Sequence, residues 1–95
     1  MRFQLREYRI EESRLDDFVA EWRAGILPLR VAAGFSILGP WLEREERLFV
    51  WILGFDGDIR SAEAAYHASP ERTALSPDPG RLVADRRDMW LEAPP

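Results

Sequence analysis

The chain has 95 residues, with thirteen Arg and no Lys, seventeen acidic side chains, one His and no Cys. This length provides one domain, over residues 1–95, with a small hydrophobic core. The absence of Cys excludes disulfides, thiol nucleophiles and the usual tetrahedral zinc sites, and no carboxylate spacing suited to a metal ion is present. The formal charge of −4 argues against a nucleic acid partner, because phosphate binding needs an excess of basic residues.

A membrane partner is not expected either. The longest strongly apolar run, residues 48–55, is far too short to span a bilayer. The charged amino terminus lacks the apolar segment of an ordinary signal peptide, so we expect a cytoplasmic protein.

Residues 3–10 predict the first strand. Phe3 and Leu5 alternate with the polar residues Gln4 and Arg6, which is the pattern of a strand whose two faces differ. The alternation therefore assigns each side chain of this strand to one face of a sheet.

A helix is predicted from Ser13 onward. Asp16 stands where a capping box usually has Glu or Gln, so Ser13 is expected to cap the helix only weakly. Pro28 removes a backbone donor and predicts a kink or a remodelled turn, and Gly34 suits the end of the helix. The apolar side chains recur at helical spacing and form one stripe: Leu15, Phe18, Val19, Trp22, Ile26, Leu29 and Ala33.

Two further strands, over residues 35–42 and 47–55, are predicted to form a β-hairpin around the charged turn 43–46. The second strand is apolar on both faces between residues 48 and 53, which is typical of a strand that is covered on both sides.

The last third of the chain predicts a short helix and an edge strand. The helix begins after the turn 56–58, faces inward with Ile59, Ala62 and Tyr66, and ends at residues 69–70. Residues 70–80 are expected to be irregular, with one helical turn. Residues 82–91 predict the last strand, and its charged residues 85–88 are typical of an edge strand that avoids further pairing.

The element order is therefore β-α-β-β-α-β, which predicts an α+β, ferredoxin-like fold: an antiparallel four-stranded sheet with the helices on one face. Two helices cover only one face of such a sheet, yet the third strand is apolar on both. Another copy of the same sheet is the simplest cover for the remaining face. We therefore expect a homodimer through the sheet faces.

Several segments, taken in order, carry a family resemblance. They are residues 3–10, 22–28, 34–35, 39–41, 46–55, 69–72 and 77–79, with a strand after the last. In this order they resemble the NIPSNAP family, and the final segments resemble the ending of its small bacterial members. The resemblance implies the dimeric α+β barrel superfamily, which also holds cofactor-independent antibiotic biosynthesis monooxygenases and haem-degrading enzymes. It supplies no settled catalytic residues, and the second helix is shorter than in longer members.

His67 is the only side chain that titrates near neutrality without help. It lies at the edge of the inward face of the second helix, one turn after Glu63, which can hydrogen-bond to it. A boundary histidine is the favoured interpretation, and a general base and a haem axial ligand are the alternatives. No second haem-specific feature is present, so no cofactor is predicted.

Polar residues of the first strand are the second group of candidates. This strand is central in a ferredoxin-like sheet, where unpaired polar groups are costly. Arg6 and Tyr8 point one way and Glu7 points the other way. We expect these residues to form cross-strand or cross-subunit ion pairs, for example with residues 86–88 of the last strand. The alternative is that Arg6 and Tyr8 orient an acidic or phenolic small molecule in a pocket.

Aromatic residues form the third group. Four Trp in a chain of this size are typical of a core or a dimer interface, but they also suit a cavity for a flat apolar ligand between sheet and helices. Trp22 and Tyr66 both face the sheet and are expected to line such a cavity. The candidate ligand-binding residues are Arg6, Tyr8, Trp22, Trp51, Tyr66 and His67.

Three functions are consistent with these patterns. The first is a NIPSNAP-like homodimer of undefined biochemical role that binds a small apolar or aromatic ligand between sheet and helices. The alternative is a cofactor-independent monooxygenase acting on a quinol or a polyketide-like phenol, for which Tyr8, Glu7 and His67 are the catalytic candidates. The third is a purely structural module whose hydrophobic surfaces are all covered by dimerisation. Whether the chain is an enzyme stays open at this point.

Overall fold

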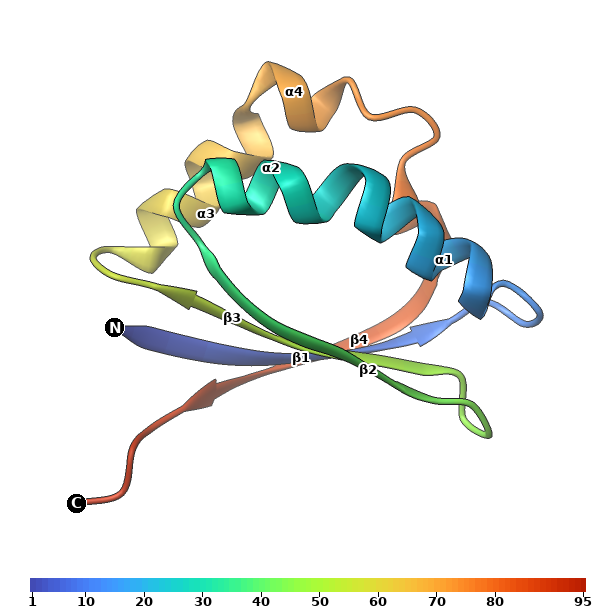
Figure 1. Ribbon diagram of the computed structural model, residues 1–95, viewed down its shortest axis with the longest axis horizontal. Coiled ribbons are helices and arrows are strands. Elements are labelled where there is room, and N and C mark those ends of the chain that lie inside the picture. The colour runs from blue at the N-terminus through green and yellow to red at the C-terminus, as the bar shows by residue number, and fades with distance from the viewer.

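The computed structural model describes residues 1–95 and contains one antiparallel sheet with all helices on one of its faces (Figure 1). The strand order is β2-β3-β1-β4. The predicted α+β, ferredoxin-like arrangement is therefore confirmed, and β4 is an edge strand as expected. The strands are β1 (Arg2–Ile10), β2 (Ser36–Glu43), β3 (Leu48–Phe55) and β4 (Val83–Leu91). The helical elements are α1 (Leu15–Glu21), η1 (Trp22–Ile26), α2 (Leu27–Ala32), α3 (Ile59–Ala68), α4 (Pro70–Thr73) and η2 (Pro79–Leu82).

The first helix begins one residue later than the capping box predicts. Ser13 has left-handed backbone geometry, with φ at 63°, and does not cap the helix. Arg14 is the N-cap residue instead, and the first helical hydrogen bond runs from the Phe18 N–H to the Arg14 carbonyl at 2.9 Å. The predicted capping role of Ser13 is therefore wrong, because its backbone turns away from the helix before the first turn closes.

The predicted irregularity near Pro28 is confirmed as a π-helical turn, η1, directly before α2. The Leu27 N–H bonds to the Trp22 carbonyl across this wide turn. A π turn contains one residue more than an α turn, so the residues after it are rotated relative to a regular helix. Arg30 thereby takes a buried position and Ala33 is exposed, which corrects the predicted place of Ala33 on the apolar stripe.

The hydrophobic core lies between the helices and the helix-facing side of the sheet. Trp22 is central to it, since its ring lies 5.1 Å from that of Phe49 and 5.4 Å from that of Trp51, both edge-on. Such edge-to-face pairs are a favourable arrangement for aromatic rings. The buried hydrophobic residues are Tyr8, Ile10, Leu15, Phe18, Trp22, Ile26, Phe35, Phe49, Trp51, Leu53, Ile59, Tyr66 and Leu82.

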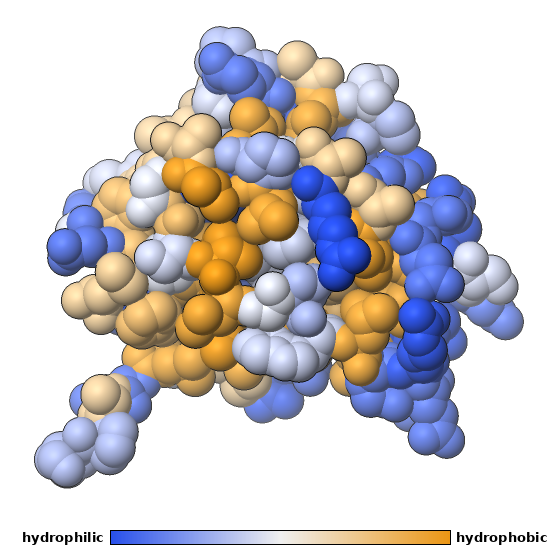
Figure 2. All heavy atoms as spheres, in the orientation of Figure 1, coloured by the Kyte–Doolittle hydropathy of each residue, from blue (hydrophilic) through white to orange (hydrophobic).

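The opposite face of the sheet is also apolar, and no helix covers it (Figure 1). The pairing register places Leu38 next to Ile52, and Ile52 next to Leu5, on that face. Leu38 is 50% exposed and the other two are half-buried. The space-filling view shows the molecule from the side and not onto this face; apolar residues gather over the middle of that side, while hydrophilic residues cover the end with the β2–β3 turn (Figure 2). No helix has the length and apolar character needed to cross a membrane.

Candidate functional site

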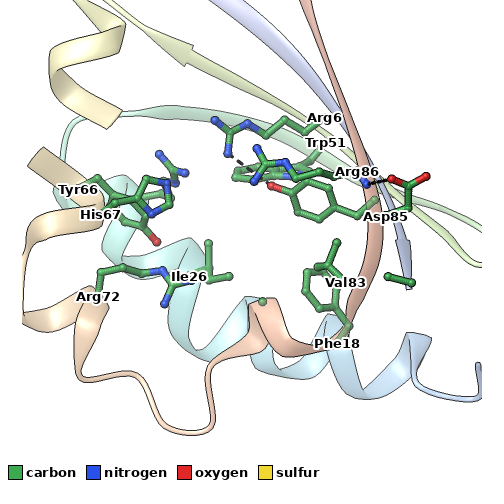
Figure 3. Close-up of a pocket in the computed structure, with 14 residues that line it drawn as sticks. Arg6, Phe18, Ile26, Trp51, Tyr66, His67, Arg72, Val83, Asp85 and Arg86 are labelled. Atoms are coloured by element: carbon green, nitrogen blue, oxygen red, sulfur yellow. Dashed lines mark hydrogen bonds between the residues drawn. The ribbon is translucent and has the colours of Figure 1, made fainter. Parts of the chain in front are cut away.

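A cavity of about 390 Å³ lies between the helix-facing side of the sheet and the helical layer (Figure 3). Its walls come from segments far apart in the sequence. They are the strands β1, β3 and β4, the continuous helical segment α1–η1–α2, helix α3 and the residues after α3. Arginine and aromatic side chains dominate the lining. The polar lining residues are Arg6, Tyr8, Arg30, Tyr66, His67, Arg72, Asp85 and Arg86, and the apolar ones include Phe18, Ile26, Trp51 and Val83.

Glu63 on α3 joins two buried arginines at one wall of the cavity. The Arg6 Nη2 donates to Glu63 Oε2 at 2.8 Å, and the Arg6 Nε donates to the Gln4 side chain at 2.8 Å. Arg30 donates to the same carboxylate through both terminal nitrogens, with Nη2 at 3.4 Å from Oε2. Arg6 is 4% exposed and Arg30 is 2% exposed. We call Arg6, Arg30 and Glu63 the arginine–glutamate cluster.

Aromatic rings surround the Arg30 guanidinium. Its Cζ lies 3.8 Å from the Tyr66 ring centroid and 4.8 Å from that of Phe35. The Trp51 ring centroid is 5.7 Å from the Arg30 Cζ and 5.5 Å from the Arg6 Cζ. These cation–π contacts stabilise a charge that burial alone would disfavour.

The arginine–glutamate cluster sets the ionisation of the carboxylate and the imidazole beside it. Burial raises the pKa of Glu63, but the hydrogen bonds and charges of Arg30 and Arg6 outweigh burial and lower the pKa to about 2. His67 lies one turn later, with its Nε2 3.4 Å from Glu63 Oε2. Burial and the charge of Arg30 lower the pKa of His67, against the opposing effect of Glu63, so the imidazole is neutral at pH 7.

Five of the predicted site residues line the same cavity. Arg6, Tyr8 and Trp51 extend from the sheet, and Tyr66 and His67 extend from α3 (Figure 3 labels all of these except Tyr8). The structure brings these five side chains together, and their role in binding a ligand stays a prediction.

Trp22 and Glu7 are placed elsewhere. Trp22 is 0% exposed and does not line the cavity, because its indole is enclosed by Phe49 and Trp51. Its predicted place in the cavity lining is wrong. Glu7 lies on the open face of the sheet with Val50 and cannot reach a ligand between sheet and helices, so it is not a catalytic candidate there.

The expected ion pairs between the first and last strands are also corrected. Arg6 lies opposite Asp88 in the register but pairs with Glu63 on α3. Asp88 pairs with Arg86 of its own strand, at 2.6 Å. The helix-facing direction of Arg6 explains the difference, since α3 supplies a carboxylate directly above β1.

Sequence reasoning missed Arg30 and Arg72 as site residues. Arg72 follows α3 in the segment expected to be irregular. Arg30 is four residues after Ile26, which is four after Trp22, so these residues form one row on the helix surface. This row could have indicated that Arg30 faces the core. An arginine is rarely buried, however, so the sequence alone does not favour a core position for it. No group of three or more His, Asp or Glu side chains is positioned to hold a metal ion.

No family model matches the sequence, and no curated protein matches it. Solved structures do match the fold. An uncharacterized NIPSNAP domain protein from Burkholderia xenovorans has a TM-score of 0.86 at 16% identity, over 99% of this chain and 95% of that one. A NIPSNAP family protein from Agrobacterium tumefaciens has a TM-score of 0.84 at 13% identity, over 96% of this chain and 90% of that one.

A more distant similarity extends to an antibiotic biosynthesis monooxygenase, with a TM-score of 0.65 at 16% identity over 100% of both chains. At these identities the matches establish the fold and no activity. The chain therefore has the fold of NIPSNAP proteins, and the resemblance expected from the sequence is confirmed at that level.

Proposed function

We propose that the protein is a homodimer that binds a small aromatic or apolar molecule in the cavity between sheet and helices. The observation that carries this proposal is the cavity itself. Its volume of about 390 Å³ lies in the range of small-molecule sites, and its lining combines aromatic surfaces with a few fixed polar groups. The buried arginine–glutamate cluster holds one wall rigid through three side chains.

The open face of the sheet supports the dimer part of the proposal. Apolar residues from all four strands lie there, and none of them is fully buried in the single chain. In a two-fold dimer, this face of one chain would pack against the same face of the second chain. The residues concerned are Phe3, Leu5, Leu38, Trp41, Val50, Ile52, Met89 and Leu91.

A second candidate function is a cofactor-independent monooxygenase, and the neutral His67 at the cavity favours it. A neutral imidazole can accept the proton of a bound phenol and leave an electron-rich phenolate. Molecular oxygen is then the oxidant: one oxygen atom enters the ring to give a quinone, and the other leaves as water.

Native mass spectrometry tests the binding proposal. Freshly purified protein should appear as a dimer of 11.0 kDa chains with a reproducible extra mass. Val83→Trp, which fills part of the cavity from the helix-facing side of β4, should remove that mass. Ala65→Trp, on the exposed surface of α3, is the matched control and should retain it. Extra mass that survives Val83→Trp would place the ligand outside the cavity and contradict the proposal.

A further inference from the structure

The arginine–glutamate cluster carries a net positive charge inside the protein. Arg6 and Arg30 contribute two positive charges, and Glu63 is the single carboxylate that both of them contact. Arg72 and Arg86 do not change this balance, because each pairs with a carboxylate of its own, Asp78 and Asp88. A buried charge without a counter-charge is unfavourable, so an anion next to this cluster would be stabilised.

No other carboxylate of the cavity lining supplies the counter-charge. Asp85 belongs to the lining, but its side chain points away from the cavity and accepts from the Arg86 backbone N–H at 2.9 Å (Figure 3). His67 is neutral at pH 7 because its pKa is lowered by burial and by Arg30. The positive charge therefore faces the cavity with no acidic side chain opposite it.

Buried donor atoms without an acceptor gather at the α3 end of the cavity, namely the Tyr66 hydroxyl, the Arg30 Nε and the Arg72 Nε. Arg72 lies close enough to Tyr66 to donate to its hydroxyl oxygen, but a guanidinium cannot accept, so the hydroxyl proton has no acceptor. Tyr66 is 4% exposed, and its ring lies directly against the Arg30 guanidinium. Arg72 approaches the same end from below Tyr66 and His67 (Figure 3). Buried donors without acceptors are rare in proteins and indicate that an acceptor belongs there.

We infer that the molecule bound in the cavity is a carboxylate with a flat apolar body, which rests on the proposed function of small-molecule binding. The carboxylate lies among Arg30, Tyr66 and Arg72. A single negative charge matches the single excess positive charge of the cluster, and the planar N–H groups of guanidinium match the two oxygens of a carboxylate. The apolar body lies along the other side of the cavity, against Phe18, Ile26 and Val83.

A pair of isosteric probes tests this inference. The full-length protein is titrated at pH 7 with 2-naphthoate and with 2-naphthamide, which differ in charge but hardly in shape, and binding is measured by calorimetry. The carboxylate should bind about tenfold to a hundredfold more tightly than the amide, the range expected for hydrogen bonds to a charged group. Equal affinities would overturn the carboxylate assignment and leave the proposed function intact. If neither probe binds, the result would count against both the carboxylate assignment and the proposed function.

Two variants locate the charge recognition. Tyr66→Phe removes only the hydroxyl, and Arg72→Gln removes a charge at a position that is not part of the core. Each should weaken the binding of naphthoate more than the binding of naphthamide, so that the preference for the carboxylate falls. Arg81→Gln is the control, because Arg81 also pairs with a carboxylate, Glu21, but lies outside the cavity. A preference that persists unchanged in both variants would refute the proposed position of the carboxylate.

Discussion

Arg30 and Glu63 form an ion pair that connects α2 with α3 above the sheet, and both terminal nitrogens of Arg30 donate to the Glu63 carboxylate. Arg30 comes from α2 and Glu63 from α3, 33 positions apart in the sequence. Arg6 donates to the same carboxylate from β1, so one acidic side chain joins both helical segments to the central part of the sheet. The wall of the cavity therefore depends on a single carboxylate, and the effect of removing it can be predicted.

Glu63→Gln is expected to destabilise the protein by about 3–5 kcal/mol, because it leaves two buried guanidinium groups without a counter-charge. Urea unfolding at pH 7 measures this. Glu21→Gln breaks the pair with Arg81, which lies at the surface, and should cost no more than about 1 kcal/mol. If both variants unfolded at the same urea concentration, the cluster would have no special role in stability.

The stability of the wild type should also fall in acid in a defined interval. The pKa of Glu63 is lowered in the folded protein from an ordinary 4.5 to about 2, so the unfolded chain takes up this proton first as the pH falls. The stabilisation is complete above about pH 4.5 and is lost progressively down to about pH 2, by about 3 kcal/mol in total. Urea unfolding at a series of pH values should therefore give a steeper acid decline for the wild type than for Glu63→Gln. Parallel declines would argue against a lowered pKa at Glu63.

The sequence predicted the fold well, because the alternation in β1 and the apolar stripe of the first helix are local patterns. The same alternation correctly assigned Arg6 and Tyr8 to one face and Glu7 to the other. It could not show which helix covers that face, and for this reason Arg6 was paired with the wrong strand.

Arg30 and Trp22 illustrate the limit of helical periodicity. The π turn before Pro28 rotates the following residues, so Ala33 leaves the apolar stripe, while Arg30, at the end of the row that contains Trp22 and Ile26, is buried although it is charged. Trp22 faces the sheet as the periodicity predicts, but the rings of Phe49 and Trp51 separate it from the cavity. Whether an inward side chain joins the core or a cavity depends on residues distant in sequence.

Leu38→Glu should dissociate the proposed dimer, because it places a charge next to Ile52 on the apolar sheet face that no helix covers. Sedimentation at micromolar concentration should then show an 11.0 kDa species in place of a dimer. Val31→Glu is a matched control, since Val31 is exposed to a similar extent but lies on α2. A wild type that sediments as a single chain, or a Leu38→Glu variant that still dimerises, would exclude an interface through this face.

If the protein is a monooxygenase, substitutions of His67 and of Glu7 should have different effects on its activity. If the protein oxidises a phenol, His67→Ala should lower the rate of oxygen consumption with a naphthol or hydroquinone substrate by about a hundredfold or more, because it removes the base at the cavity. Glu7→Gln should leave the rate unchanged, since Glu7 lies on the opposite face of the sheet. An oxygen electrode with a panel of such substrates measures both. Wild-type turnover that is insensitive to His67→Ala would assign proton transfer to another group. Absence of turnover with the whole panel, together with binding of naphthoate, would favour a binding protein over an enzyme.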